Sequence, residues 1–486
     1  MVNFKLLYKI LGSLLFLEAA FLIGCLIIAL AYGESDSLAF LTTILITVCI
    51  GSVLKFMGRE AENRMGRRDA YLVVTLTWII FSLIGALPFL ISGYIDNFTN
   101  AYFETMSGFT TTGASIIDDL DNYPHGLLLW RSTTHWIGGL GIVFFTVALL
   151  PSLVGGGSVK VFSAEATGPI KSKLHPRLST TAKWIWTVYT LLTLTCAISY
   201  WICGMGVFDA VNHSMATTAT GGFGTHSSSI AYFQSPTIEW VCTIFMLLSG
   251  VNFSLIYLSF FKGGLKNLIN DPEFKCYTFI VSMSAAIICL MIMIENNYTF
   301  ANGIRHAMFQ VAAFITTTGF YSDNAAEWPR ITWIILSFCM FSGACAGSTS
   351  GGFKCVREVM IMKVIKNQIK LIIHPKAILP VRVGGQNIHS SATSTLLAFL
   401  SLYVIIILVA STLFVFMGVE DTNAITISVS SVGNVGPTLG NMIGPTSSWN
   451  CLPDAAKWLS TVLMLTGRLE IFSVFVLFTP AFWKEY

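Results

Sequence analysis

The stretch Thr110-Thr111-Thr112-Gly113-Ala114-Ser115 decides how the rest of this 486-residue chain folds. It recurs as Ile315-Thr316-Thr317-Thr318-Gly319-Phe320, and more loosely as Ala219-Thr220-Gly221-Gly222-Phe223 and Ser431-Val432-Gly433-Asn434-Val435-Gly436. An alanine stands twelve positions before one glycine of each copy: Ala101 before Gly113, Ala210 before Gly222, Ala307 before Gly319 and Ala424 before Gly436. This spacing selects Gly222 over Gly221 as the equivalent glycine. Four copies in one register indicate a fourfold internal repeat.

The composition excludes a soluble fold. Charged residues make up 11% of the chain, whereas soluble domains contain about 25%. Many apolar runs have the length of a membrane span, such as Leu11 to Tyr32, whose only charged side chain is Glu18. About 20 apolar residues cross the hydrocarbon layer as a helix. We therefore predict an all-α integral membrane protein, and we expect the first run to be retained because it is too long for a removable signal peptide.

The basic residues indicate the orientation. They gather at the two termini and in segments 55–68, 160–183, 262–275 and 354–382. The exceptions are Arg131, Arg305, Arg330, Lys457 and Arg468. The positive-inside rule then places these segments and both termini in the cytoplasm.

The order of apolar runs repeats along the chain. Two spans, at 8–31 and 38–56, come before the first motif. Each motif then lies in the order span, short helix, glycine-bearing loop, span, as at 71–91, 97–112 and 127–150. This arrangement predicts ten spans, an even number that agrees with both termini on one side. The predicted units are two N-terminal helices in 1–69 and pore modules in 70–160, 161–270, 271–384 and 385–486.

The four glycine-bearing loops have the chemistry of a cation filter. A short helix that dips into a membrane and returns as an extended loop leaves carbonyl groups unpaired, which is costly in hydrocarbon. Four such loops around one axis offset that cost when their carbonyls replace a cation's hydration shell. Oxygen ligands without carboxylates suit a monovalent ion better than Ca²⁺. A single copy would be an ordinary turn, but four in register favour pseudo-fourfold modules around one pore. The expected filter loops are Thr111, Thr112 and Gly113; Thr220, Gly221 and Gly222; Thr317, Thr318 and Gly319; and Asn434, Val435 and Gly436.

The third module carries a second unusual segment, at residues 343–352. Its small residues are poor helix formers, and they favour either an intramembrane loop or a close-packed patch between helices. The expected gate residues here are Gly343, Gly347, Ser348, Thr349, Ser350, Gly351 and Gly352. Val356 to Ile373, which follows, reads as a basic amphipathic helix at the cytoplasmic face.

Arg468 lies near the centre of the last expected span, 457–484. An arginine there costs about 2.5–3.5 kcal/mol on translocon scales and indicates function. Facing the pore, it would repel a cation ~8 Å away by roughly 2 kcal/mol. The alternative is a buried pair with Glu470, although residues two positions apart point to different sides of a helix.

The chain resembles the TrkH/KtrB/HKT superfamily of cation transporters over essentially its whole length, and the TrkH branch in particular. The resemblance rests on the four filter loops and the two extra N-terminal spans. It implies a single K⁺-selective, Rb⁺-permeable pore for potassium uptake, with K⁺ as the transported ion and no bound cofactor. It also implies that Arg468 and the loop 343–352 form the gate below the filter. In the plant branch a serine in the first copy accompanies sodium preference, so Gly113 favours potassium. The fourth copy, Asn434-Val435-Gly436, departs from the threonine pattern.

The resemblance further implies a homodimer in the inner membrane of a bacterium, regulated by a cytoplasmic nucleotide-binding subunit of the TrkA (RCK) type. The basic segments 354–382 and 160–183 are the expected docking face, and contact with lipid headgroups is the alternative; no nucleic-acid partner is expected. A carrier that couples K⁺ to H⁺ or Na⁺ is the competing function. An enzyme is not expected, because the eleven cysteines form no metal-ligand spacing and no nucleophile motif is present.

Overall fold

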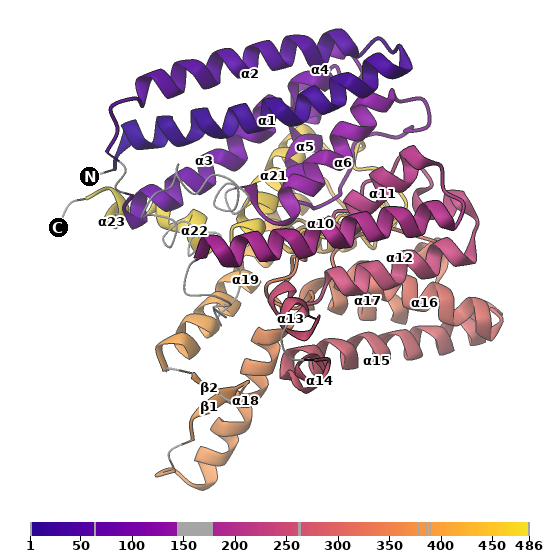
Figure 1. Cartoon of the computed structure of the whole chain (residues 1–486). Coiled ribbons are helices and arrows are strands. Elements are labelled where there is room, and N and C mark those ends of the chain that lie inside the picture. Colours follow the sequence, from indigo (N-terminus) through magenta and orange to yellow (C-terminus); the bar gives the residue numbers. More distant parts are fainter. Residues whose placement is uncertain are drawn as a thin grey trace.

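The computed structural model describes residues 2–62, 65–142, 178–260, 264–377, 379–384, 386–388 and 390–484. This part of the chain is almost entirely helical, which confirms the all-α prediction (Figure 1). One small feature was not predicted. Strands β1 (Val381–Val383) and β2 (Gln386–Ile388) form an antiparallel hairpin after the third module.

Two long helices begin the chain. Helices α1 (Phe4–Tyr32) and α2 (Ser37–Met57) lie side by side at one edge of the bundle (Figure 1). Asn3 caps α1 by accepting a hydrogen bond from the Leu6 amide, and Gly33 ends it in a left-handed conformation. The two helices approach closely because Gly12 and Gly51 face each other.

The helices that follow repeat one order four times, each time with a short helix leading into a filter loop. The first unit comprises α3 (Arg67–Gly85), α4 (Leu87–Ser92), α5 (Phe98–Phe109) and α6 (His125–Gly139). The second comprises α10 (Leu178–Ile202), α11 (Val207–Ala219), η2 (Ser229–Phe233), α12 (Pro236–Ser249), α13 (Phe253–Leu258) and α14 (Lys266–Asn270). The third comprises α15 (Pro272–Glu295), α16 (Phe300–Ile315), η4 (Ala325–Glu327), α17 (Arg330–Ser342) and α18 (Cys355–Ile373). The fourth comprises α19 (Ser390–Phe416), α20 (Asp421–Gly433), α21 (Asp454–Arg468), α22 (Phe472–Phe475), η5 (Val476–Phe478) and α23 (Pro480–Trp483).

The four units close into a ring. In each unit the short helix packs against the first long helix of its own unit, as α5 does on α3. The helix after each filter loop packs against the short helix of the next unit: α6 on α11, α12 on α16, α17 on α20 and α21 on α5. The last contact joins the fourth unit back to the first, so the four short helices surround one axis.

Each helix that follows a filter loop ends early, a break that the sequence predicted only in the third module. The number of ten spans stays a prediction. Within the described residues six helices are long and apolar enough to cross a membrane: Phe4–Tyr32, Ser37–Met57, Arg67–Ser92, Thr181–Ile202, Pro272–Glu295 and Ser391–Phe416. The helices after the filter loops have 13 to 15 residues, about 20–22 Å of helix. The last of them, α21, bends by 106° into Phe472–Phe478.

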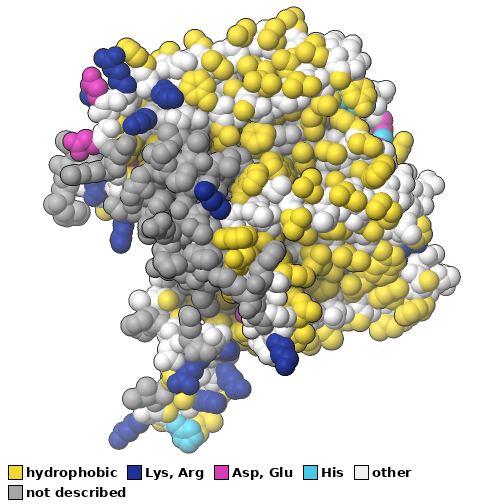
Figure 2. Space-filling model, viewed as in Figure 1, with side chains coloured by type: hydrophobic (Ala, Val, Ile, Leu, Met, Phe, Trp, Pro, Cys, Tyr) yellow, Lys and Arg dark blue, Asp and Glu magenta, His cyan; other side chains and the backbone are white. Residues whose placement is uncertain are grey.

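The surface of the bundle is that of a protein in lipid. Figure 2 shows hydrophobic side chains over the visible face of the bundle, whereas Lys and Arg gather near the chain termini and on the projecting α18. The exposed apolar side chains include Ile27, Leu45, Leu194, Ile244 and Leu290. Exposed large hydrophobic side chains in such number cover a face only when lipid or another protein replaces water there.

The close contact between α1 and α2 generates a stability prediction. A methyl group at Gly12 would lie 2.7 Å from the Gly51 carbonyl oxygen, whereas one at Gly24 of the same helix would meet nothing within 4 Å. Gly12→Val should therefore cost about 1–3 kcal/mol and lower the melting temperature in detergent by about 4 °C or more. Gly24→Val is the matched control, and equal melting temperatures for the two variants would contradict the packing described.

Candidate functional site

The four filter loops share one backbone conformation. In every copy the residue two before the filter glycine, and the glycine itself, have positive φ angles. The values are 52° and 79° for Thr111 and Gly113, 54° and 86° for Thr220 and Gly222, 56° and 76° for Thr317 and Gly319, and 54° and 97° for Asn434 and Gly436. The backbone thus makes Gly222, not Gly221, the equivalent of the other three glycines. Asn434 replaces threonine in the fourth loop without changing the fold of the loop.

The filter glycines are required by close contacts around the ring. A methyl group on any of them would lie 2.0–2.4 Å from a carbonyl oxygen of the next unit. The oxygen always belongs to the residue just before the next filter glycine. A methyl group on Gly113 would contact the carbonyl of Gly221, one on Gly222 that of Thr318, one on Gly319 that of Val435, and one on Gly436 that of Thr112. The fourth contact returns to the first loop. Four separate segments therefore form one closed ring of backbone.

The carbonyl oxygens of this ring have no donors. Within the described residues no hydrogen bond reaches a carbonyl of the filter loops 111–113, 220–222, 317–319 and 434–436. Most of these residues are buried, for example Thr112, Thr318 and Val435 at 0% exposure. Buried carbonyls in proteins almost always accept a hydrogen bond, so a whole ring of exceptions requires an explanation.

The threonine hydroxyls are engaged with protein groups. Thr112 and Thr318 each share a 2.8 Å hydrogen bond with the threonine two residues before it. The Thr112 hydroxyl also accepts from the Asn434 side chain at 3.0 Å. Among the described residues the carbonyls of the loops are thus left without hydrogen-bond donors, whereas the hydroxyls of Thr112 and Thr318 serve to fix the loops.

The ring separates two cavities. All four filter glycines line the first, which we call the glycine cavity, together with Ser115, Arg131 and His226. The second, which we call the arginine cavity, is lined by Gly351, Asn434, Arg468 and Glu470. The four short helices end three or four residues before their filter glycines, at Phe109, Ala219, Ile315 and Gly433. Their carbonyl ends point along the chain into the loops and add partial negative charge near the ring.

The segment 343–352 contains no helix and lies against three of the filter units. The Thr349 hydroxyl donates to the Thr218 carbonyl at 3.0 Å. The Gly351 amide donates to the Thr317 hydroxyl at 2.8 Å, and the Gly352 amide donates to the Gly433 carbonyl at 2.9 Å. These bonds hold the segment directly beneath the second, third and fourth filter loops.

Arg468 connects this segment to the first unit. Its guanidinium donates to the Thr349 carbonyl at 3.0 Å and to the carbonyls of Gly138 and Gly139 at 2.5 and 2.7 Å. Its position follows from the repeat. A side chain at Gly138 would clash with the Phe109 carbonyl, and one at Gly467, just before Arg468, would clash with the Val432 carbonyl. Phe109 and Val432 each lie four residues before a filter glycine, so Gly138 and Gly467 are equivalent positions. Arg468 thus stands where the first unit has Gly139.

Further charges surround the arginine cavity. Glu470 does not pair with Arg468 but forms an ion pair with Arg357 of α18. Lys354, which is 2% exposed, donates to the Ser350 carbonyl. The loop 343–352 is therefore held by two cationic side chains, through the adjacent carbonyls of Thr349 and Ser350.

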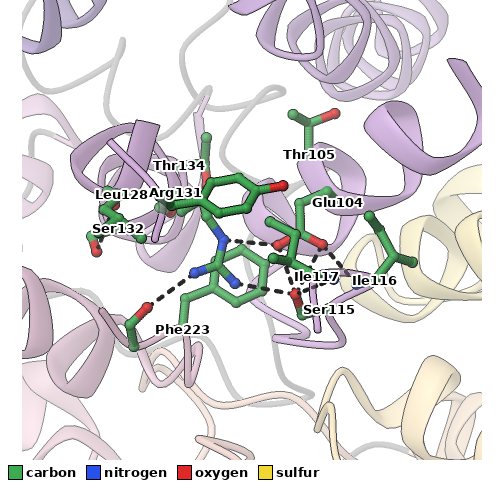
Figure 3. Close-up of polar contacts among 12 residues, drawn as sticks. Glu104, Thr105, Ser115, Ile116, Ile117, Leu128, Arg131, Ser132, Thr134 and Phe223 are labelled. Carbon is green, nitrogen blue, oxygen red and sulfur yellow. Dashed lines mark hydrogen bonds and ion pairs between the residues drawn. The ribbon is translucent and has the colours of Figure 1, made fainter. Parts of the chain in front are cut away.

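The glycine cavity has its own polar network. Arg131 and Glu104 form a buried ion pair beside Ser115 (Figure 3). On the loop after the first filter, Asp121 pairs with His226 at 2.5 Å. Partial burial raises the pKa of the Asp121 carboxyl, but the hydrogen bonds from His226 and Ser227 outweigh it and hold that pKa below its usual range.

Comparison with known proteins agrees with this geometry. The family model described as TrkH, cation transport protein, matches residues 36–485. The chain belongs to the TrkH family of cation transport proteins. It is 37% identical, over the full length of both chains, to the Trk system potassium uptake protein TrkH of Escherichia coli. It is 36% identical, again over both full lengths, to the protein of that name from Halomonas elongata. The crystal structure of the potassium transporter TrkH from Vibrio parahaemolyticus matches 99% of this chain and 100% of that one, with a TM-score of 0.89 and 34% identity.

This TrkH-family chain contains functional candidates that its sequence did not reveal. Neither the pairing of Glu104 with Arg131, nor the role of Lys354, nor the pairing of Arg357 with Glu470 was predicted. Glu104 could have been found, because it lies nine positions before Gly113, and His213 and Gln310 hold the same place before Gly222 and Gly319. Arg131 was noted only as a basic residue outside the cytoplasmic segments. Glu470, the partner of Arg357, comes from a distant element and leaves no local signal, whereas Lys354 donates to the carbonyl of Ser350, only four residues before it.

The ring geometry generates a prediction at Gly222. Gly222→Ala places a methyl group 2.0 Å from the Thr318 carbonyl oxygen, at a φ of 86° that alanine rarely adopts. We expect cation flux into proteoliposomes to fall by about tenfold or more, since left-handed strain alone costs about 1–2 kcal/mol. Gly33→Ala is the control, because Gly33 also has positive φ but has nothing within 4 Å of the added methyl group. Normal flux through Gly222→Ala would contradict the close ring.

Proposed function

We propose that this chain takes up potassium through a gated, K⁺-selective and Rb⁺-permeable pore, with the four filter loops as the selectivity filter. The observation that carries the proposal is the closed ring of backbone whose carbonyls accept no hydrogen bond from the described part of the chain. Such oxygens can replace the hydration shell of a monovalent cation. The family membership and the potassium-uptake names of the relatives support the same ion.

The competing function is a carrier that couples K⁺ to H⁺ or Na⁺. Coupled carriers place titratable carboxylates near the midplane of the membrane. Among the described residues the carboxylates lining the two cavities are already engaged: Asp118 accepts from Ser448 and Asn450, and Glu470 pairs with Arg357. Glu18 has no hydrogen-bond partner, but it lies on α1, outside the ring of four units. The pore is therefore the better-supported function.

Flux measurements separate these two functions. We expect proteoliposomes of the purified chain to take up K⁺ and Rb⁺ well above Na⁺ when no proton or sodium gradient is imposed. Uptake that appears only with such a gradient would contradict the pore and establish the carrier.

The gate of this pore is proposed to be the loop 343–352 together with Arg468. The loop bonds to the second, third and fourth units beneath the filter, and Arg468 joins it to the first. The arginine thus both holds the loop in place and presents a positive charge to an arriving cation.

Arg468→Ala should raise Rb⁺ flux by about tenfold, because a barrier lower by about 1.4 kcal/mol has that effect. The control is Arg330→Ala, which removes the same charge from an exposed side chain stacked on Trp333. Unchanged or lower flux through a folded Arg468→Ala protein would contradict its role as gate.

The proposed setting is the inner membrane of a bacterium, with the arginine cavity and both termini toward the cytoplasm. The basic side chains Lys363, Lys366, Lys370, Lys376 and Arg382 lie on and beyond α18, which projects from the bundle (Figure 2). We propose that this surface meets a TrkA-type nucleotide-binding subunit or lipid headgroups, in a homodimer of the chain. Most of the other expected docking segment, 160–183, lies outside the described residues.

A further inference from the structure

A buried ion pair lies directly behind the first two filter loops. Glu104 of α5 and Arg131 of α6 are each 1% exposed, and the Arg131 Nε donates to the Glu104 carboxylate at 2.8 Å. The other guanidinium nitrogens of Arg131 donate to the Gly224 carbonyl at 3.0 Å and to the Ser115 hydroxyl at 3.2 Å (Figure 3). The Phe223 ring lies 4.0 Å from the guanidinium carbon. One side chain thus contacts a short helix and the ends of two filter loops.

Glu104, the partner of Arg131, makes further contacts with the first filter loop. Its carboxylate accepts hydrogen bonds from the Ser115 hydroxyl at 3.0 and 3.1 Å and from the Ile116 amide at 2.9 Å. Ser115 and Gly224 each lie two residues after the filter glycine of their own loop. The ion pair therefore fixes where the first and second loops leave the ring, and so fixes the spacing of their carbonyls.

The repeat shows what is special about the first unit. The residues nine positions before the filter glycines are Glu104, His213, Gln310 and Ile427. His213 shares a 3.2 Å hydrogen bond with Thr225, and Gln310 donates to the Asp323 carbonyl at 3.4 Å. Three units thus tie the short helix to the segment after the filter. At this position only the first unit has a carboxylate, which needs a nearby cation because an unpaired buried charge is costly.

We propose that Arg131 is a positioning residue that determines ion selectivity. It neutralises Glu104 and holds the carbonyls of the first and second filter loops at the spacing that favours K⁺ and Rb⁺ over Na⁺. This inference rests on the proposed function of the ring as a filter. The planar guanidinium is required, because its fork reaches Glu104, Ser115 and Gly224 at once, whereas a lysine ammonium is a single point of charge.

The variant that tests this role is Arg131→Lys, which keeps the charge and removes the fork. Its matched control is Arg305→Lys. Arg305 also forms an ion pair, with Glu239 at 3.0 Å and side-chain exposures of 17% and 6%. Within the described residues Arg305 forms no hydrogen bond to a filter loop. Both proteins are reconstituted in proteoliposomes, and the ratio of Rb⁺ to Na⁺ uptake is measured without an imposed gradient of protons.

We expect the Rb⁺ to Na⁺ ratio to fall about tenfold in Arg131→Lys, which corresponds to about 1.4 kcal/mol of lost discrimination. The ratio should stay at the wild-type value in Arg305→Lys. The ratio does not depend on how much folded protein is reconstituted, so reduced stability alone cannot change it. A folded Arg131→Lys protein with the wild-type ratio would overturn the proposal.

A second variant covers the case in which Arg131→Lys does not fold. The double variant Glu104→Gln with Arg131→Met removes both charges and leaves no buried ion unpaired. It should fold and show the same loss of discrimination. Wild-type discrimination in this variant, or failure of it to fold as well, would overturn the proposal, because the pair would then act in folding only. The wild-type protein in the same assay tests the filter itself: if it does not favour Rb⁺ over Na⁺, the proposed function fails independently of Arg131.

Discussion

The structure depends on a ring of backbone carbonyls in buried loops, to which none of the residues that the structure describes donates a hydrogen bond. Unpaired carbonyls are costly away from water, so each feature around the ring serves to hold them there despite that cost. Glycines allow the four loops to meet at contacts that a methyl group would block. Threonine hydroxyls bond behind the loops, and the short helices add partial negative charge from their carbonyl ends. We propose that a monovalent cation is the ligand that this arrangement best accommodates.

The ring is fourfold in its backbone, whereas its surroundings are not. Three features break the symmetry, and each places charge beside the path that we propose for the ion. Arg468 stands in the fourth unit where the first has a glycine, and it reaches across to the carbonyls of Gly138 and Gly139. The third unit contributes the loop 343–352, which Lys354 and Arg468 hold beneath the ring. The first unit contributes the buried pair of Glu104 and Arg131 on the opposite side. We therefore propose that the repeat builds a filter and that the departures from the repeat control it.

The filter loops and the long helices could be predicted from the sequence, because the four copies of the repeat can be aligned with one another. The shared distance from Ala101 to Gly113 and its three equivalents located every filter loop and chose Gly222 over Gly221, and the φ angles agree. The apolar runs predicted the long helices, and the small residues at 343–352 indicated a break in the second span of the third module. The breaks after Gly139 and Arg468 were not predicted, because hydropathy does not register contacts with neighbouring backbone. The partners of Arg131 and Glu470 lie in other parts of the chain and depend on the closed ring, so local patterns could not reveal them.

The central claim is that the four filter loops bind one dehydrated monovalent cation through their carbonyls. Anomalous diffraction from crystals grown with Rb⁺ in place of K⁺ tests it most directly. The account predicts an anomalous peak on the axis of the ring, among the carbonyl oxygens of Thr112, Gly221, Thr318 and Val435. A well-ordered ring without such a peak, or Rb⁺ bound only at carboxylates elsewhere, would contradict it.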